Sequence, residues 1–476
     1  MKITLVYPGF SEDPSGLQEP LGILYIASML RKEGHKVSLI DLTFKKDKNV
    51  LKKAAKSSDL IGMSATSLIF ENAKQTLKEI KKTNPKVLCF LGGSHATLSP
   101  EEALKEGFDY AIIGEGETTT VKLANAINKQ MSEKGIDGLA FKKNNKIIIN
   151  PKKTFIEDFN KLPFPARDLW NYNKYFKTGT SEIGIIATRG CPYNCLYCKP
   201  MVDKLFGNKI RKRSPKNVVE EIEQIAKDYK HLFKLSNKSE KGLEKSKTFQ
   251  KRKVKLWFKD DTLTLCGIDW FKEFKKELKE RNLKIDWGCH TRVDNVNYEL
   301  LKIMKECGLT HISFGVESGS QKILNYYRKG TTPEQAIKAF KACKKLGIQT
   351  FAYFMIGAPI ETREDLEKTY QLIKKIKPDG LDVFTTVPYP GNNLYDLLKK
   401  NKQLKEGEIN YYSKQSLIKM KYLTDKDLDK YRRKMYRVNN INLTMKYFTS
   451  VKEFKKLVKY IIKRPGFVIN YLKRSL

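Results

Sequence analysis

Three cysteines in one short segment are the residues of this sequence best suited to chemistry. Cys191, Cys195 and Cys198 lie within TRGCPYNCLYC, separated by three and then two residues. Thiolates at this spacing can converge on one iron–sulfur cluster from a single loop. Three ligands on a four-iron cluster leave one iron open, and an open metal position lets a cofactor or substrate bind directly. A structural zinc site is the alternative, but zinc normally takes four closed ligands, and no fourth Cys or His lies nearby.

The segments that must position these cysteines form two series of strands and helices. We expect residues 1–145 to form a Rossmann-like α/β domain with an open parallel sheet, because strand patterns alternate with helical ones and glycines follow the strands. The strand patterns lie at 3–7, 37–40, 60–63, 87–91 and 110–113. Ligands of such sheets bind at the carboxyl ends of the strands. The small residues found there are Ser64, Thr66, Gly92, Gly93 and Gly114.

The second series begins after a linker predicted at 146–180, where Pro163 and Pro165 exclude a continuous helix or central strand. In residues 181–400 a repeated helix–Gly–strand rhythm predicts a full or partial TIM-type (β/α) barrel. Its strand patterns lie at 183–187, 254–258, 283–287, 311–316, 350–356 and 380–387. Barrel active sites lie at the carboxyl ends of strands, and the three cysteines follow the first strand. Residues 401–476 are expected to be a basic helical region.

The cysteine segment resembles the signature of the radical S-adenosylmethionine (SAM) superfamily in its spacing, its tyrosine before the last cysteine and its place after the first barrel strand. The likeness extends over about residues 1–400 to the group that joins a cobalamin-binding-like domain to a radical SAM barrel. Members of this group include the anaerobic magnesium-protoporphyrin ester cyclase and the class B radical methyltransferases. The matching stretches are LGGSHAT (91–97), GEGE (114–117), LPFPAR (162–167), FKDD (258–261), GVESGS (315–320), IGAP (356–359) and PYPG (388–391).

The resemblance implies a [4Fe–4S] cluster on the three cysteines, with SAM bound to the open iron through its amino and carboxylate groups. Reductive cleavage of SAM would give a 5′-deoxyadenosyl radical that abstracts a hydrogen atom from the substrate. The implied SAM contacts are the backbone of Tyr197 at the adenine, Asp260 or Asp261 at the cationic groups, Glu317 and Ser318 at the ribose and methionine, and Gly357 at the adenosine.

Each of these residues also has a purely structural interpretation. The aspartate pair could cap the loop after its strand, and Glu317 could serve as an ion-pair partner. Four cysteines outside the motif lie in apolar patterns and are expected to be small buried hydrophobes; they are Cys89, Cys289, Cys307 and Cys343.

The resemblance also implies cobalamin as a cofactor. Cobalamin domains commonly carry Asp-x-His-x-x-Gly after an early strand, whereas this chain has Asp41-Leu42-Thr43-Phe44. Many radical relatives lack that motif and still hold cobalamin, and others have lost the cofactor. The small residues at the ends of the first series could let a corrin lie on the backbone, or could equally suit tight turns. We expect His95 to be a hydrogen-bonded loop histidine rather than a cobalt ligand.

The predicted function is that of a radical SAM enzyme, with cobalamin-dependent methylation or rearrangement of an unactivated carbon as the leading hypothesis. A cobalamin-free enzyme performing C–C coupling or cyclisation is the alternative. A tRNA methylthiotransferase would need a second cluster on N-terminal cysteines, and residues 1–145 contain only Cys89. A non-catalytic iron–sulfur or cobalamin sensor would have no need for Asp260, Asp261 and Glu317.

The net charge of +38 indicates either an anionic partner or a generally Lys-rich, solvated surface. We expect a small-molecule or lipid-like substrate, an electron donor of the flavodoxin or ferredoxin type, and no nucleic acid. A basic amphipathic helix at 451–464 could lie on an anionic membrane or pack on the barrel. With no signal peptide or 18-residue apolar run, the protein is expected to be cytoplasmic. The Lys-rich stretch at 230–255 is expected to be a surface insertion.

Overall fold

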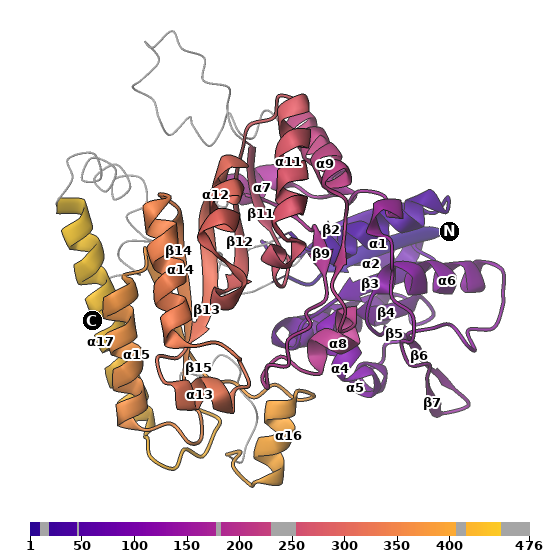
Figure 1. The fold of residues 1–476 in the computed structure, drawn as a ribbon. Coiled ribbons are helices and arrows are strands. Elements are labelled where there is room, and N and C mark those ends of the chain that lie inside the picture. The colour runs from indigo at the N-terminus through magenta and orange to yellow at the C-terminus, as the bar shows by residue number, and fades with distance from the viewer. Residues whose placement is uncertain (10–18, 45–46, 178–181, 230–253, 406–415, 449–476) are drawn as a thin grey trace. The chain divides into compact units, whose positions relative to one another are not determined.

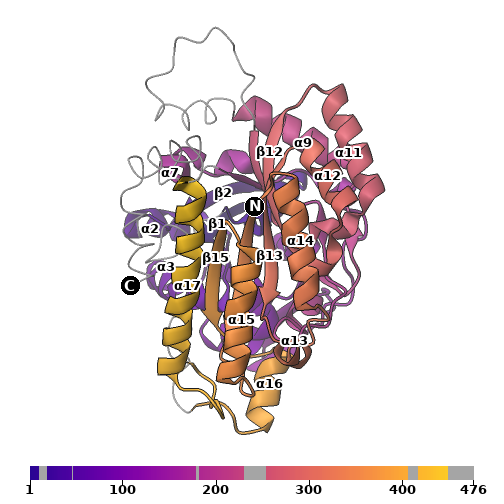
Figure 2. The same cartoon turned by 60° about the vertical axis from the view of Figure 1, so that its left-hand side comes forward.

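The computed structural model describes residues 1–9, 19–44, 47–177, 182–229, 254–405 and 416–448, and Figures 1 and 2 show the fold in two views. The chain divides into two compact units. The first comprises Met1–Pro192 and Pro200–Ile225, and the second comprises Tyr193–Lys199 and Ala226–Leu476. The division passes through the cysteine segment, so that Cys191 belongs to the first unit and Cys195 and Cys198 to the second.

The first unit contains a seven-stranded sheet with the strand order β2-β1-β3-β4-β5-β6-β7. Its strands are β1 (Lys2–Tyr7), β2 (Lys36–Asp41), β3 (Leu60–Ser64), β4 (Leu88–Gly92), β5 (Tyr110–Ile112), β6 (Leu139–Lys143) and β7 (Lys146–Ile149). Strands β1 to β5 run parallel, as predicted, whereas β6 pairs antiparallel with β5 and with β7. The five predicted strands are therefore confirmed as parallel, and the sheet extends beyond them by an antiparallel edge. The turn at Asn144 and Asn145, both with positive φ, closes the β6–β7 hairpin that the pattern did not reveal.

Helices cover both faces of this sheet (Figure 1). Helices α1 (Leu21–Lys32) and α6 (Gly116–Asn128) pack on one face, where Ile23, Ala27 and Leu123 join the core. The other face carries α2 (Lys48–Ser57), α3 (Phe70–Thr83), α4 (Ser94–Leu98) and α5 (Pro100–Lys105). Successive side chains of the central strands point to opposite faces of the sheet, and both faces are buried. Those strands therefore have nearly continuous apolar sequences.

The segment predicted as a linker, 146–180, begins with β7, and the part after β7 packs closely within the first unit. The Ser28 hydroxyl donates to the Phe164 carbonyl at 2.5 Å, and the Tyr175 hydroxyl donates to Asp41 at 2.7 Å. The segment contains α7 (Tyr172–Lys177), and it is followed by β8 (Ile183–Ile185), β9 (Thr188–Arg189), α8 (Met201–Phe206), β10 (Arg211–Lys212) and α9 (Pro215–Asp228). The two prolines therefore interrupt regular structure without detaching the chain from the sheet.

The second unit is built on parallel strands in the order β15-β14-β13-β12-β11. These strands are β11 (Val254–Phe258), β12 (Ile285–Arg292), β13 (Leu309–Glu317), β14 (Gln349–Ile356) and β15 (Gly380–Thr385). The helices that pack beside one another along them are α11 (Ile268–Glu280), α12 (Tyr298–Glu306), α14 (Pro333–Lys345), α15 (Arg363–Ile376) and α17 (Asp425–Phe448). The short helices α13 (Gln321–Tyr326) and α16 (Asn393–Lys400) follow β13 and β15. This parallel strand-and-helix series is the predicted partial barrel.

Two boundaries in the second unit differ from the sequence prediction. Strand β12 extends five residues beyond the predicted end at Trp287, through a stretch in which only His290 is partly exposed. The chain after residue 400 is not helical at once: Leu404 pairs with Ile418 in an isolated bridge, and α17 begins only at Asp425. Helix α17 then packs beside α15, where Lys434 and Glu367 form an ion pair at 2.7 Å (Figure 2).

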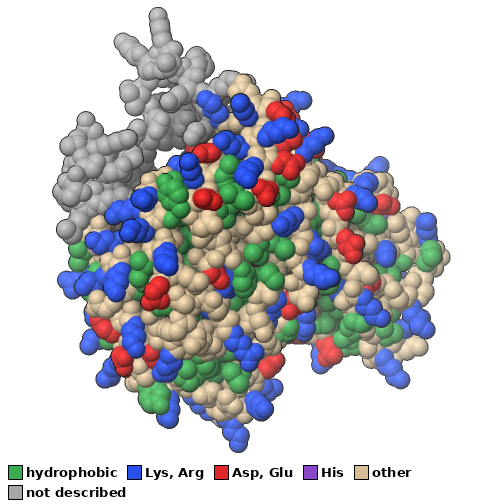
Figure 3. Space-filling model, viewed as in Figure 1, with side chains coloured by type: hydrophobic (Ala, Val, Ile, Leu, Met, Phe, Trp, Pro, Cys, Tyr) green, Lys and Arg blue, Asp and Glu red, His purple; other side chains and the backbone are tan. Residues whose placement is uncertain are grey.

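Charge is dispersed over the visible face, where basic side chains alternate with acidic and apolar ones (Figure 3). Such a distribution is typical of a solvated Lys-rich surface. Both the Lys-rich stretch, up to residue 253, and the basic helix predicted at 451–464 lie outside the described residues. Among the residues that the structure does describe, no helix is both long enough and apolar enough to cross a bilayer.

Candidate functional site

The cysteine segment follows β9 and turns tightly at its centre. The carbonyl of Cys195 accepts hydrogen bonds from the backbone N–H groups of Cys198 and Lys199, both at 3.0 Å. Cys195 is buried, whereas Cys191 and Cys198 are partly exposed. All eight cysteines lie in the described ranges, and none of them forms a disulfide. No three His, Cys, Asp or Glu side chains of the described residues gather closely enough to hold a single metal ion.

Arg292, at the end of β12, is a site residue that sequence reasoning missed. Its Nη1 lies 3.5 Å from the Sγ of Cys195, and its guanidinium stacks on the Tyr193 ring at 3.7 Å. Asp294 holds the guanidinium through two hydrogen bonds of 2.9 Å. A fixed positive charge stabilises negative charge on a neighbouring sulfur. This donor fits a thiolate-ligated cluster, because such a cluster is anionic.

A buried polar group of three side chains lies beside the same segment. The Lys329 ammonium donates to Glu317 at 2.7 Å and to the Tyr197 hydroxyl at 3.1 Å. The Tyr197 hydroxyl also donates to Glu317, and its pKa is raised, first by burial and then by the Glu317 carboxylate. The Lys329 carbonyl in turn accepts from Arg292 at 2.5 Å. Lys329 therefore connects Glu317 to the arginine at Cys195.

Glu317 adopts a backbone conformation that is uncommon for its type. Its φ is +66°, and the register between β13 and β14 shifts between Gly315 and Glu317. A non-glycine residue in this region costs roughly 1–3 kcal/mol, so surrounding contacts must hold it there. The ion pair with Lys329 supplies one such contact, which matches the structural interpretation that the sequence left open. The other interpretation is a contact to SAM, and it would use the same buried carboxylate.

Of the remaining predicted SAM contacts, Ser318 directly follows β13, the aspartate pair follows β11, and Tyr197 lies in the cysteine segment. Ser318 is fully buried, and its hydroxyl bonds Thr369 at 3.1 Å. Asp260 is buried after β11, whereas Asp261 is exposed. The Tyr197 carbonyl accepts from the Asn392 amide at 3.2 Å, so this backbone group already has a protein partner. The buried carboxylates of Asp260 and Glu317 fit a cationic cofactor such as SAM.

Gly357 begins the loop after β14 with φ +93°, which favours glycine. Its N–H and that of Ala358 donate to one oxygen of Glu361, at 2.5 and 3.2 Å. Glu361 is fully buried, and the other oxygen has no hydrogen-bond partner. Burial raises the pKa of Glu361 to about 8. Sequence reasoning missed this residue.

In the first unit, the predicted cobalamin contacts lie at the carboxyl edge of the sheet. Ser64, Thr66 and Gly93 are partly or fully exposed there, and small side chains at such an edge fit a flat macrocycle. The glycines also have structural reasons: a Cβ on Gly93 would lie 2.7 Å from the Ala65 carbonyl, and one on Gly114 would lie 2.9 Å from the Lys204 carbonyl. Gly92 is buried at the end of β4.

His95 lies in α4 rather than in a loop, and it is buried. Its ring stacks on Phe70 at 3.6 Å, and its Nδ1 lies 3.2 Å from the Ser67 hydroxyl. Burial lowers the pKa of His95 to about 4, so the ring is neutral near pH 7. A stacked, hydrogen-bonded ring agrees with the structural role expected for this histidine.

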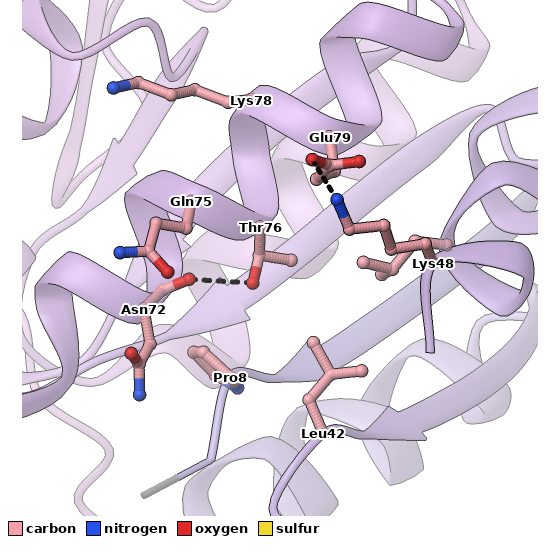
Figure 4. A pocket seen from close by; sticks show the side chains of 9 residues that line it. Pro8, Leu42, Lys48, Asn72, Gln75, Thr76, Lys78 and Glu79 are labelled. Carbon is pink, nitrogen blue, oxygen red and sulfur yellow. Dashed lines mark hydrogen bonds and ion pairs between the residues drawn. The ribbon is translucent and has the colours of Figure 1, made fainter. Parts of the chain in front are cut away.

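A cavity of about 250 Å³ lies elsewhere in the first unit, beside the ends of β1 and β2 and between α2 and α3 (Figure 4). Pro8, Leu42 and Leu51 give it an apolar lining. At its rim Lys48 and Glu79 form an ion pair at 3.0 Å, and the Thr76 hydroxyl donates to the Asn72 carbonyl at 2.7 Å. None of the predicted site residues lines this cavity.

A parallel α/β unit followed by a parallel strand-and-helix unit with a three-cysteine segment defines the class of radical SAM enzymes that carry an N-terminal cofactor domain. Two family models match accordingly: the B12 binding domain over residues 13–124 and the radical SAM superfamily over residues 185–373. An uncharacterized methyltransferase of Pyrococcus horikoshii is 32% identical over 100% of this chain and 98% of its own length. The chain therefore belongs to the cobalamin-binding group of the radical SAM superfamily.

Other relatives extend the comparison. The anaerobic magnesium-protoporphyrin IX monomethyl ester cyclase of Rubrivivax gelatinosus is 28% identical over 84% of this chain and 70% of its own length. The radical SAM methyltransferase TsrM of Kitasatospora setae, solved with cobalamin and a [4Fe–4S] cluster, has the same fold. Its TM-score is 0.70, with 17% identity over 84% of this chain and 75% of its own.

The family assignment confirms several predictions made from the sequence. The chain is an enzyme, and its cofactors are a [4Fe–4S] cluster, SAM and cobalamin. The predicted order of a Rossmann-like domain followed by a partial barrel is also confirmed.

Proposed function

We propose that this chain is a cobalamin-dependent radical SAM methyltransferase that acts on an unactivated carbon of a small-molecule substrate. The observation that carries the radical chemistry is the fixed guanidinium of Arg292 at 3.5 Å from the Cys195 sulfur, continued by the Lys329–Glu317 pair. Methyl transfer is supported by the Pyrococcus methyltransferase, because that similarity spans the whole chain.

Each residue of the site has a defined task in this proposal. Cys191, Cys195 and Cys198 hold the cluster, and Arg292 stabilises its negative charge. Glu317 and Asp260 offer carboxylates to the cationic part of SAM, and the loop at Gly357 presents backbone to its adenosine. The cluster, when bound and reduced by a flavodoxin- or ferredoxin-type donor, supplies the electron for reductive SAM cleavage, and cobalamin supplies methyl transfer.

A radical SAM cyclase is the second candidate. It is favoured by the similarity to the magnesium-protoporphyrin ester cyclase, which covers 84% of this chain. The two candidates differ in their products. A methylated product formed together with S-adenosylhomocysteine supports the first, and 5′-deoxyadenosine formed without methylation supports the second.

The decisive experiment is anaerobic reconstitution of the full chain and of Cys195→Ala. We expect the wild type to hold about four irons and to form 5′-deoxyadenosine or S-adenosylhomocysteine from SAM under reduction. Cys195→Ala should lose the cluster absorbance and both products. Cys89→Ala is the matched control, since Cys89 is also buried but lies in the first sheet, where burial raises its pKa to about 12. A variant without all three motif cysteines that still cleaved SAM would overturn the proposal.

A further inference from the structure

Arg189 lies two residues before Cys191, and its side chain is buried inside the first unit. One nitrogen of its guanidinium bonds Glu115 at 3.1 Å, and the other bonds Glu117 at 2.5 Å. The guanidinium also lies over the rings of Tyr25 and Phe159, at 5.4 and 5.0 Å. Two carboxylates and two aromatic faces therefore fix both the position and the plane of this side chain.

A second arginine completes the group. Strands β9 and β10 pair antiparallel with Arg189 opposite Arg211, and Arg211 makes two hydrogen bonds of 2.9 Å to Glu115. Glu115 also accepts from the Ile156 N–H at 2.8 Å, and its side chain is fully buried. Two carboxylates thus balance two guanidiniums. We call these four residues, Glu115, Glu117, Arg189 and Arg211, the GEGE clamp.

The GEGE clamp connects two parts of the sequence that the family models treat separately. Its carboxylates follow β5 within the region matched by the B12 binding domain, and its arginines lie in the region matched by the radical SAM superfamily. The backbone of Gly190, between Arg189 and Cys191, is also restricted. Gly190 has φ +91°, and a Cβ there would lie 2.3 Å from the Lys209 carbonyl. The approach to Cys191 therefore has little freedom to move within the first unit.

Stability alone is a weak reason for such a group. A buried ion network adds little net stability over apolar packing, because desolvation offsets the Coulombic gain. Bidentate arginine–carboxylate pairs do, however, fix direction more strictly than apolar contacts do. Cys191 is the one motif cysteine that belongs to the first unit, so this unit alone must set its position.

We propose that Arg189 is a positioning residue for the cluster, and that Glu115 and Glu117 of the cobalamin-type domain hold the strand end from which Cys191 projects. The inference rests on the proposed role of Cys191 as a cluster ligand. It assigns to the GEGE stretch a task within the protein rather than a contact with cobalamin. Two glutamates of the region matched by the B12 binding domain then control the geometry of one iron ligand in the region matched by the radical SAM superfamily.

The first unit supplies a matched control for this proposal. Glu221 is 1% exposed and pairs with Arg213 and with Arg167, the latter at 2.6 Å. This network resembles the GEGE clamp in burial and composition, but it does not involve Arg189 or the GEGE stretch. Glu117→Gln and Glu221→Gln therefore each remove one charge from a buried arginine network, and only the first loosens Arg189.

The experiment compares the two variants with the wild type as full-length, anaerobically reconstituted proteins. The unfolding temperature should fall by similar amounts in the two variants. Only Glu117→Gln should show changed g-values of the reduced cluster by electron paramagnetic resonance, and roughly tenfold faster loss of iron to a chelator. If Glu117→Gln does not fold, Glu117→Asp is compared with Glu221→Asp by the same measurements.

Two results would overturn the inference. One is a wild-type spectrum and wild-type chelator resistance in the folded Glu117 variant. The other is an equal change in the Glu221 variant, because the effect would then be general destabilisation. A wild-type chain that takes up no cluster would instead contradict the proposed function, so the two failures can be told apart.

Discussion

At the scale of single residues, the site depends on charges that the protein itself fixes. Arg292 is held on three sides, by Asp294, by the Tyr193 ring and by the Lys329 carbonyl. Its charge is permanent at any physiological pH. A guanidinium so constrained keeps its donor on the Cys195 sulfur without any rearrangement when the charge of the site changes.

The Arg292→Gln variant tests this role. Reduction adds a negative charge to the cluster, and loss of a neighbouring cation should therefore make the cluster harder to reduce. We expect its midpoint potential to become more negative, and Arg292→Lys to restore part of the difference. Potentiometric titration followed by paramagnetic resonance measures the potential. Arg281→Gln, which removes an arginine paired with Glu277 on α11, should leave it unchanged. An unchanged potential in Arg292→Gln would contradict the assigned role.

Sequence reasoning located the cysteines but not the residues around them, and the reason is physical. Three cysteines at short spacing are visible in one segment. Arg292, at the end of β12, and Lys329, after α13, lie about 100 and 130 positions further along the chain. Their placement depends on strand order and register, which local patterns do not encode. Glu317 was found only through its motif, and its left-handed backbone could not be anticipated from the residue type.

At the scale of elements, the loop from β14 to α15 shows how one carboxyl group can organise a turn. Glu361 accepts the N–H groups of Gly357 and Ala358, and α15 then begins with a capping box between Thr362 and Asp365. The pKa of Asp365 is lowered to about 2 despite an opposing effect of burial, because Ser320, Lys322 and Thr362 donate to it. Two neighbouring carboxyl groups thus differ widely in their proton affinity.

This difference predicts a pH dependence of stability. The folded pKa of Glu361, about 8, lies above its ordinary value of 4.5, so the folded chain binds this proton more tightly than the unfolded chain does. The resulting stability is complete below about pH 4.5 and is lost as the pH rises through about 8. Glu361→Gln keeps an acceptor for both N–H groups without a titrating proton. Its free energy of unfolding should therefore rise relative to wild type between about pH 5 and about pH 8.

Urea unfolding at several pH values measures this change. Asp365→Asn is the control: its loss relative to wild type should be constant over the same range, because Asp365 remains ionised throughout. Glu361→Ala should cost about 1–3 kcal/mol for each N–H group left buried without an acceptor. A difference between Glu361→Gln and wild type that does not vary with pH would refute the raised pKa.

Most helices and strands were predictable because the hydrophobic period of the sequence and its capping residues indicate the same elements. The helix at 21–32 and the strand at 254–258 have the predicted bounds, and Thr332 begins α14 with the expected capping box. The antiparallel β6–β7 hairpin was missed, since its strands have mixed apolar and basic residues and no strict alternation. The end of β12 was missed because its last residues include the polar His290 and Arg292, which interrupt the apolar pattern of a buried strand.

At the scale of the whole molecule, the basic amphipathic helix expected at 451–464 lies outside the described residues and stays a prediction. Apolar residues at 451, 454, 458 and 461 share one helical face, and lysines cover the opposite face. We expect the full chain to co-sediment with anionic liposomes at low salt and to be released at high salt. A chain truncated after Thr449 should remain in solution. Equal binding by the two chains, or none by either, would exclude this helix as an anchor.

The distribution of thiols has a practical consequence for anyone handling this protein. Burial raises the pKa of Cys89, Cys307 and Cys343 to about 12, and Cys289 is raised as well, so these sulfurs stay protonated and out of reach of electrophiles. Cys191 and Cys198 are the cysteines with partly exposed side chains. Brief alkylation of the native chain followed by peptide mass mapping will therefore label the motif selectively. The labelled fraction counts the molecules in a preparation that carry no iron.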